Sequence, residues 1–451
     1  IVVNDNEMSI APNVGALSEY LTRLRVSKGW TSTKKAVEQG LGSIPLVGKP
    51  LRQVVLWMKN TVKSIFMSEG FFEALGFHYF GPINGHDIAA LEHTLERAKD
   101  YDEPVVIHVL TQKGHGYGKA EERPEIFHGT PPFYVESGAK RKDSPLPSFG
   151  KVAARTLVEM ARENQRIVTV TAAMPSGTGL SRFQGVFPDR MIDVGIAEEH
   201  AVTMCAGLAA GGMRPYFAVY ASFFQRGYDQ MIHDVCMQKL PVCFLLDRAG
   251  LVGEDGATHQ CCEDIALMRT IPGMVILNPA DDVEAKACVK AAYEYNGPVY
   301  LRFGRLAVPV INDRPDYKFE LGKGVVLREG KDVTIIATGL PVNNCLQAAE
   351  KLAAEGIDAK VINIHTIKPL DEELIIAAAQ ETGKVVTVEE HSVIGGLGSA
   401  VCDVLSANVP TKVLKIGIND VYGESGPALE LIEKYGLGIN GIYEKVKAFV
   451  S

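Results

Sequence analysis

Short apolar runs alternate with amphipathic stretches along most of this chain, and that alternation restricts its possible folds more than any other feature. In the middle of the sequence the apolar runs lie at 166–172, 215–220, 241–247, 273–278 and 298–303. The same pattern recurs at 333–338, 359–364, 384–390 and 411–416. Strands that alternate with helices in this way build parallel or mixed sheets with helices on their faces. The sequence therefore predicts an α/β protein.

Two polar connections divide the chain into three blocks. The stretch at 128–148 contains several prolines and charges and is typical of a linker between domains. We predict domains at 1–127, 149–315 and 320–451 around that linker, which suits 451 residues at roughly 150 residues per domain. Within the first block, residues 11–70 indicate helices interrupted at GSIPLVGKP, so we expect a helical lid insertion at about 11–70.

Charge and cysteine spacing exclude several classes of protein. The formal net charge is -8, whereas binding to nucleic acid or to a membrane surface requires a basic patch. No run approaches the roughly 20 apolar residues of a transmembrane helix. The eight cysteines form no CxxC pair, which favours buried thiols over a zinc site. We expect a cytoplasmic protein that acts on small molecules.

The chain begins with an apolar run that leads directly into polar side chains. Ile1, Val2 and Val3 precede the sequence NDNEM, which ends at Met8. The amide oxygen of Asn6 and the carbonyl oxygen of Met8 are hard donors that suit Mg²⁺. An Asn-Asp-Asn sequence after a strand also forms turns. From the residues alone, both interpretations stay open.

Glu198 opens a predicted helix directly after a predicted strand, and ligands of open α/β sheets bind beyond the carboxyl ends of strands. An acid in the first helical turn is stabilised by the helix dipole, so a surface cap is one interpretation. The helix that follows, AVTMCAGLAAGG, is rich in small residues that permit close approach of a ligand or of another backbone. This second feature favours a buried Glu198.

A glycine-rich stretch, DRAGLVGEDGATHQ at 247–260, collects several charged residues. Arg248, together with Arg305 further along, could bind a phosphate through two parallel hydrogen bonds. The glycines match neither of the common nucleotide-binding patterns. His259 is either a general acid or base or a structural loop histidine.

Six stretches resemble the thiamine-diphosphate enzymes of the transketolase superfamily over nearly the whole chain: NDNEMSIAPNVGAL, FGPINGHD, QKGHGYGKAEE, AEEHAV, SFFQRGYDQ and DRAGLVGEDGATHQ. The resemblance implies a three-domain α/β architecture whose first domain is incomplete here. The cofactor motif of the family runs from Gly-Asp-Gly to Asn-Asp-Asn, and only its second half is present, so we expect the chain as it stands to bind cofactor poorly. From EDIALMRTIP onwards the match is closer to transketolase C-terminal chains, which is compatible with a hybrid.

The resemblance also implies roles for individual residues. Thiamine diphosphate and Mg²⁺ would be the cofactors, with Asn6 and the Met8 carbonyl as metal ligands and Tyr117 against the cofactor. Glu198 would bind the pyrimidine nitrogen, and Phe223 would stack on that ring. The expected acceptor phosphate site consists of Tyr220, Arg248 and Arg305. The expected proton-transfer or donor-orienting residues are His128, Asp255 and His259.

The reaction implied is condensation of pyruvate with D-glyceraldehyde 3-phosphate, with release of CO₂. Its product would be a 1-deoxyketose phosphate that feeds isoprenoid, thiamine and pyridoxal synthesis. The alternative is a transketolase that moves two-carbon units between sugar phosphates. In either case the resemblance implies a homodimer, and the last block, which has no comparable cluster, is expected to be structural or to support dimerisation.

Overall fold

The computed structural model describes residues 1–8, 21, 71–130, 132–141 and 146–451. The lid predicted at about 11–70 lies outside the described residues apart from a single position. The chain forms two compact units, Ile1–Lys140 and Arg141–Ser451, and each is described by itself.

The first unit contains a three-stranded parallel sheet in the order β1-β3-β2. Its strands are β1 (Val2–Asp5), β2 (His78–Asn84) and β3 (Val105–Leu110), and its described helices are α4 (Phe71–Ala74), α5 (Ile88–Ala98) and α6 (Gly118–Glu122). Strand β3 is central and its middle residues are buried, as expected for the apolar run PVVIHVLT. Asp87 caps α5 by accepting a hydrogen bond from the Ala90 amide at 3.1 Å. The strands predicted at the chain start and at 104–111 are therefore confirmed.

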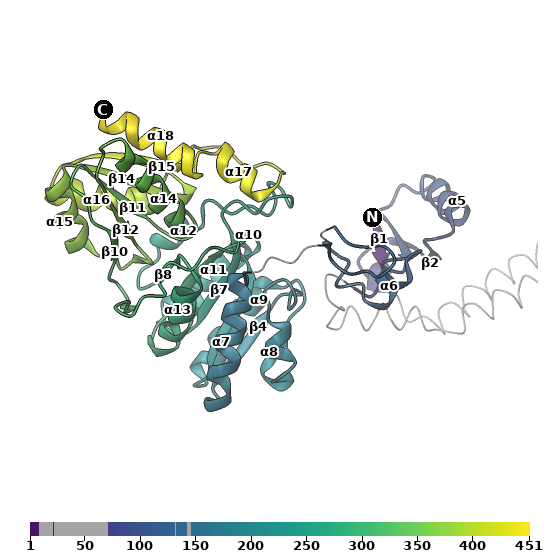
Figure 1. Ribbon diagram of the computed structural model, residues 1–451. Coiled ribbons are helices and arrows are strands. Elements are labelled where there is room, and N and C mark those ends of the chain that lie inside the picture. The colour runs from purple at the N-terminus through teal and green to yellow at the C-terminus, as the bar shows by residue number, and fades with distance from the viewer. Residues whose placement is uncertain (9–20, 22–70, 131, 142–145) are drawn as a thin grey trace, which may run out of the picture. The chain divides into compact units, whose positions relative to one another are not determined.

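The second unit contains two sheets, and Figure 1 shows the five-stranded sheet above the seven-stranded one. The strands of the larger sheet are β4 (Ile167–Thr171), β5 (Met191–Asp193), β6 (Arg214–Tyr220), β7 (Cys243–Ala249), β8 (Val275–Leu277), β9 (Val299–Gly304) and β13 (Thr366–Lys368). Those of the smaller sheet are β10 (Val325–Arg328), β11 (Val333–Ala337), β12 (Ala359–Asn363), β14 (Lys384–Ser392) and β15 (Lys412–Ile418). All nine apolar runs listed for this part of the chain form strands.

Helices flank both sheets of the second unit. Around the larger sheet lie α7 (Phe149–Glu163), α8 (Ser181–Gln184), α9 (Glu198–Ala210), α10 (Ala221–Phe224), α11 (Tyr228–Gln230), α12 (Asp264–Arg269) and α13 (Asp282–Glu294). Short 3-10 segments, η1 (Pro188–Arg190) and η2 (Gln225–Gly227), and a π-helix, η3 (Met231–Cys236), complete this layer. The smaller sheet is flanked by α14 (Pro341–Ala354), α15 (Glu372–Thr382) and α16 (Leu397–Asn408), with α17 (Ala428–Lys434) and α18 (Ile439–Val450) at the end.

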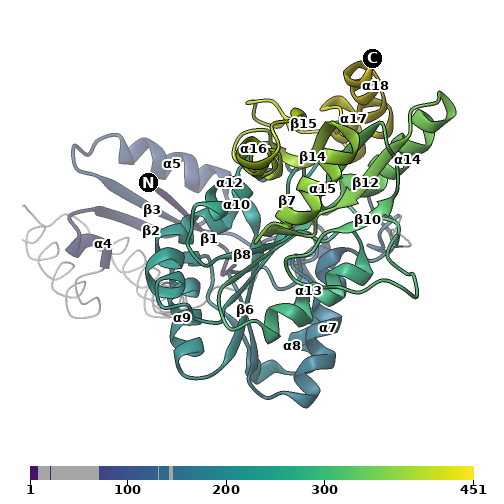
Figure 2. The same cartoon turned by 90° about the vertical axis from the view of Figure 1, so that its left-hand side faces the viewer.

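The smaller sheet shows why its sequence produces a three-layer arrangement. Successive residues of a strand point to opposite faces, and both Ile335 and Ile336 of β11 are fully buried. Ile335 belongs to a core cluster with Val342 of α14, whereas Ile336 packs in a separate cluster with Val401 of α16. A strand buried on both faces is apolar along its whole length, as VTIIA is. Figure 2 shows the helices on the two sides of this sheet.

The larger sheet has the order β13-β8-β9-β7-β6-β4-β5 and is parallel except for β13. From β4 the chain continues outward to β5, whereas from β6 it continues the other way to β7. The strand order therefore reverses between β4 and β6, and in open α/β sheets the crevice at such a point is where ligands bind. The outermost strand, β13, comes from the segment after β12, so the last block of the chain completes this sheet.

The end of strand β7 differs from the expectation based on sequence. The apolar run predicted to end at residue 247 continues as β7 to Ala249, so Arg248 lies within the strand instead of following it. Arg248 has a positive φ of 58°, which is rare for a side chain of this size. Separately, among the described residues, no helix combines the length and the apolar character required to span a membrane.

Candidate active site

The predicted site residues of the second unit gather at the carboxyl ends of adjacent strands. Tyr220 is the last residue of β6, Arg248 is the penultimate residue of β7, and Arg305 follows β9. Glu198 begins α9, directly after the loop that leaves β5. The topology therefore brings residues that are up to about a hundred positions apart in sequence to one edge of the sheet.

Glu198 is buried, with only 2% of its surface exposed. Its Oε2 has no hydrogen-bond partner among the residues that the structure describes. Arg226 of η2 forms an ion pair with this oxygen at 3.7 Å, which is too long for a hydrogen bond. Burial raises the pKa of Glu198 above its usual range, and the charge of Arg226 opposes that rise. The sequence-based expectation of a buried acid is confirmed, and the surface-cap interpretation is wrong.

The close approach of η2 to α9 explains how Glu198 becomes buried. A β-carbon on Gly227 would lie 2.8 Å from the side chain of Val202 and 3.5 Å from the Glu198 carbonyl oxygen. Only glycine fits this contact, as the small residues of α9 suggested. Arg226, which our sequence analysis did not single out, thereby lies 3.5 Å from Glu199 as well as near Glu198. The single positive charge within the motif SFFQRGYDQ was the signal available for it.

A contiguous cluster joins four of the predicted residues. The Arg248 guanidinium lies over the Tyr220 ring, 4.1 Å from its centroid. Phe223 stacks on Tyr220 with centroids 5.8 Å apart and meets the His259 ring edge-to-face at 5.1 Å. Arg248 also donates a hydrogen bond to the Gly177 carbonyl oxygen at 3.0 Å. The loop after β4 thus meets the ends of β6 and β7 at the point where the strand order reverses.

Arg305 lies against the glycine-rich loop, defined here as residues 250–260. Its Nη1 donates to the Val252 carbonyl oxygen, lies 3.1 Å from Glu254 and forms an ion pair with Asp255 at 3.5 Å. The structure therefore brings Arg305 and Asp255 together. Partly exposed pairs of this kind are weak and can exchange for another anion.

The first unit contains the other predicted residues. The Asn6 amide oxygen accepts a hydrogen bond from the Met8 backbone N–H at 3.1 Å, so a turn begins at Asn6, whereas Asn4 and Asp5 belong to strand β1. Tyr117 precedes α6, and its hydroxyl donates to the Val135 carbonyl oxygen at 2.7 Å. His128 is exposed, and partial burial of its ring together with the charge of Lys113 lowers its pKa. Within the described ranges, no three His, Cys, Asp or Glu side chains gather as a metal-binding group.

Sequence analysis missed a row of hydrogen-bonded polar side chains that crosses the three-stranded sheet. Asp5 Oδ2 lies 3.0 Å from His108 Nε2, and His108 Nδ1 lies 2.7 Å from the Tyr79 hydroxyl. His108 is fully buried on the central strand β3. Because these residues lie on three different strands, no local pattern connects them.

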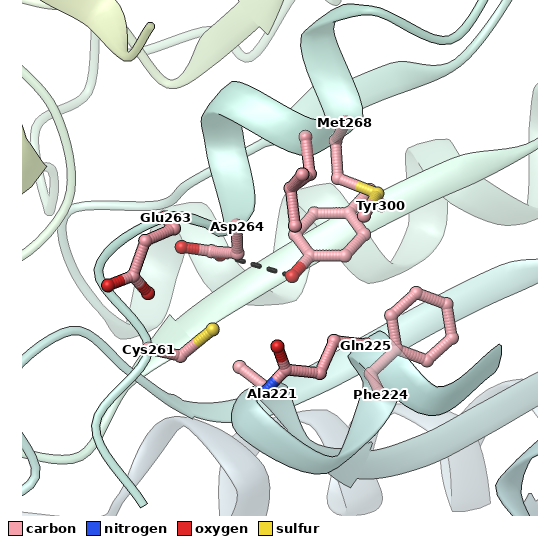
Figure 3. A pocket seen from close by; sticks show the side chains of 9 residues that line it. Ala221, Phe224, Gln225, Cys261, Glu263, Asp264, Met268 and Tyr300 are labelled. Carbon is pink, nitrogen blue, oxygen red and sulfur yellow. Dashed lines mark hydrogen bonds between the residues drawn. The ribbon is translucent and has the colours of Figure 1, made fainter. Parts of the chain in front are cut away.

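A separate small pocket, partly open to solvent, lies between α10 and α12. Figure 3 shows Gln225, Cys261 and Asp264 around it, with Tyr300 donating to Asp264 at 3.1 Å. Asp264 is already paired with the buried Arg302 at 2.8 Å. None of the predicted site residues lines this pocket, so we place the active site at the Tyr220 and Arg248 cluster.

Comparison with known proteins identifies the domains of the chain. The model of the transketolase pyrimidine-binding domain matches residues 147–310, and that of the transketolase C-terminal domain matches 322–442. A solved structure described as a split-gene transketolase, an inactive β4 tetramer, has a TM-score of 0.63 and 44% identity over 67% of this chain and 98% of its own. The fold and these matches thus define a transketolase-type, thiamine-diphosphate-dependent enzyme.

Within this class the relatives are more specific. The family model described as 1-deoxy-D-xylulose-5-phosphate synthase matches residues 1–111. The synthase of Heliobacterium modesticaldum is 46% identical over 98% of this chain and 69% of its own length, and synthase 1 of Geobacter sulfurreducens is 45% identical over 100% and 71%. The chain belongs to the 1-deoxy-D-xylulose-5-phosphate synthase family.

Proposed function

We propose that this protein condenses pyruvate with D-glyceraldehyde 3-phosphate to give 1-deoxy-D-xylulose 5-phosphate and CO₂. The observation that carries the proposal is Glu198, a buried carboxylate with an unpartnered oxygen at the edge of the sheet where ligands bind, in a chain of this family. A buried polar atom without a partner is costly unless a ligand satisfies it. The pyrimidine nitrogen of thiamine diphosphate is the partner that fits a protonated carboxyl group.

When bound, thiamine diphosphate supplies the carbanion chemistry of the reaction. Glu198 is suited to hold a proton at Oε2, because burial raises its pKa, and to bind the pyrimidine nitrogen through it. Phe223 would stack on the pyrimidine, since its ring already stacks on Tyr220 and contacts His259. In the first unit, Tyr117 would lie against the cofactor.

Mg²⁺ would be held by the Asn6 amide oxygen and the Met8 carbonyl oxygen. The hydrogen bond from the Met8 amide to Asn6 orders this turn and leaves the second lone pair of the amide oxygen for a metal. These two oxygens would share the ion with the diphosphate of the cofactor, as Mg²⁺ commonly does.

Tyr220, Arg248 and Arg305 would bind the phosphate of the acceptor. Arg248 presents its guanidinium over the Tyr220 ring, and the charge pair of Arg305 with Asp255 lies beside it on the same edge. Remote phosphate binding orients the aldehyde for attack and excludes water from it. Asp255 and His259 would orient the pyruvate carboxylate or move protons, and His128, whose lowered pKa favours its neutral form, would act as a proton acceptor near the substrate.

We also propose that the protein acts as a homodimer in the cytoplasm, where pyruvate and sugar phosphates occur. Ile196, which follows β5, and Met237, which follows η3, are apolar and more than half exposed, and we propose them as contacts of the dimer. Sedimentation measurements on the full chain test the oligomeric state.

A substrate assay distinguishes the proposal from transketolase activity, which the split-gene neighbour makes the specific alternative. The full chain is supplied with thiamine diphosphate and Mg²⁺ in large excess, because the half motif predicts weak cofactor binding, and is incubated with pyruvate and D-glyceraldehyde 3-phosphate. We expect CO₂ release that depends on both substrates. Transfer of two-carbon units from xylulose 5-phosphate to ribose 5-phosphate, without CO₂ release from pyruvate, would reject the synthase assignment in favour of transketolase.

A further inference from the structure

The last block of the chain holds the glycine-rich loop in place at several points. The Ser425 hydroxyl donates to the Glu254 carbonyl oxygen at 2.7 Å, and the Gln260 amide donates to the Glu424 carbonyl oxygen at 2.8 Å. At the base of the loop, Glu390 Oε1 accepts the Leu251 backbone N–H at 2.7 Å. These contacts join residues more than 130 positions apart in sequence, and they reach the loop that contains Asp255 and His259.

Glu390 differs from the other contact residues because its carboxylate lies between Gly250, at the start of the glycine-rich loop, and Gly304, at the end of β9. A β-carbon on Gly250 would collide with the Glu390 carboxylate, and one on Gly304 would lie 3.4 Å from its Oε2. Gly250 comes two residues after Arg248, and Gly304 directly precedes Arg305. Gly250 thus makes room for the carboxylate, which also lies within contact distance of Gly304, and each glycine is within two residues of an arginine proposed to bind phosphate.

The backbone of Glu390 is fixed as firmly as its side chain. The buried Arg302 donates to the Glu390 carbonyl oxygen at 2.9 Å and is itself anchored to Asp264. The next-but-one residue, Ser392, donates its backbone N–H to the Cys262 carbonyl oxygen at 2.7 Å. Leu251 and Glu390 are both buried, so the Leu251 N–H has no access to water as an alternative acceptor.

We propose that Glu390 is a positioning residue for the acceptor phosphate: its carboxylate sets the spacing of the β7 and β9 ends and hence of Arg248 and Arg305. The role rests on the proposed function, because it assumes that these arginines bind the phosphate of D-glyceraldehyde 3-phosphate. Glu390 does not touch substrate in this role. It acts through the Leu251 amide, through the space left by Gly250 and through its contact with Gly304.

The test compares three substitutions of Glu390 in the full chain. Glu390→Ala removes the acceptor for Leu251, Glu390→Asp shortens the side chain by one methylene, and Glu390→Gln retains an oxygen acceptor at the same length. We expect Ala and Asp to raise the KM for D-glyceraldehyde 3-phosphate about tenfold while the KM for pyruvate changes less than about twofold. In Glu390→Gln the KM for D-glyceraldehyde 3-phosphate should lie within about threefold of the wild-type value.

Glu284→Ala is the matched control, because Glu284 is also a fully buried carboxylate that joins two segments, at a place that does not include the loop. A KM for the acceptor that stays at the wild-type value in Glu390→Ala and Glu390→Asp would overturn the proposal. The proposal would also be overturned if Glu390→Ala and Glu284→Ala raised the KM for pyruvate and the KM for D-glyceraldehyde 3-phosphate equally. That result would indicate a general loss of rigidity.

Hydrogen exchange distinguishes failure of this proposal from failure of the proposed function. Exchange of the amides in the loop should accelerate in Glu390→Asp and Glu390→Ala but not in Glu284→Ala, whether or not the protein turns over pyruvate. Direct titration with D-glyceraldehyde 3-phosphate then measures binding without turnover. If wild type binds this ligand and Glu390→Asp binds it equally well, Glu390 does not position the site even where the loop exchanges faster.

Discussion

Glu198 and Glu284 are both buried carboxylates of the same unit, and the difference between their surroundings separates a binding group from a structural one. Both oxygens of Glu284 are saturated: the Ala280 amide donates to Oε2 at 2.7 Å, the Tyr317 hydroxyl donates to Oε1 at 2.8 Å, and the Asn363 amide reaches both. Oε2 of Glu198 has no such donor among the described residues. Burial raises the pKa of both groups.

The comparison teaches that burial and a raised pKa do not by themselves mark an active site. A saturated carboxylate stabilises the fold because removing it strands several donors. An unsaturated one costs stability, and at the ligand-binding edge of a sheet a ligand can complete its hydrogen bonds. The two glutamates should therefore respond to substitution in opposite ways.

Glu198→Gln and Glu198→Ala should cause the largest loss of activity. We expect kcat to fall by at least about 100-fold, which corresponds to about 2.7 kcal/mol, because a neutral amide cannot supply the proton that a carboxyl group holds. The free energy of unfolding should stay equal or rise. Steady-state kinetics and urea unfolding measure the two effects, and a variant that keeps more than a tenth of the wild-type kcat contradicts the role of Glu198.

Glu284→Ala should show the reverse pattern. Loss of the carboxylate strands the Ala280 N–H, the Tyr317 hydroxyl and the Asn363 amide, so we expect the free energy of unfolding to fall by about 3 kcal/mol. At 25 °C the folded fraction should keep its kcat. If kcat falls as far as in the Glu198 variants while the unfolding midpoint is unchanged, the comparison between the two sites fails.

Substitution of the arginines sharpens the comparison by testing the rest of the candidate site. Arg248→Ala and Arg305→Ala should each raise the KM for the phosphorylated acceptor about tenfold, or about 1.4 kcal/mol, and affect pyruvate much less. Arg248→Lys should not restore binding, because an ammonium group cannot replace the guanidinium that lies over Tyr220. Arg182→Ala, on the exposed surface of α8, is the control. Equal effects on both substrates would remove the phosphate assignment.

The smallest expected effect is on the pH dependence of stability. Burial raises the pKa of Glu284 to about 7 from its usual 4.5, so its contribution to stability is fully present below about pH 4.5 and is lost as the pH rises through 7. Glu284→Gln remains neutral at every pH. Relative to this variant, wild type should lose about 1 kcal/mol between about pH 5 and 6, measured by urea unfolding. A constant difference would contradict the raised pKa.

The sequence by itself determined the local structure and most of the candidate site. The alternation of apolar runs predicted most strands of both sheets in the second unit, because most of these runs are buried on both faces. The same pattern identified Glu198, Tyr220, Arg248 and Arg305 as residues near strand ends. Short, weakly apolar strands such as β10 and β13 escaped this reasoning, since β13 is three residues long and exists only through pairing with β8.

Only the tertiary structure decided which residues act on one another across the chain. Asp5 meets His108 over 103 positions and Glu390 reaches Leu251 over 139, and neither pair has a periodic signature. The last block, expected from its sequence to be structural or to support dimerisation, contacts the glycine-rich loop directly. Tyr317 and Asn363, which donate to Glu284, also come from distant segments. Whether a donor reaches Oε2 of Glu198 is likewise decided by packing, and none of the described residues hydrogen-bonds to it. Local sequence encodes which face of an element is buried, whereas the partners that it meets there follow from how the elements pack.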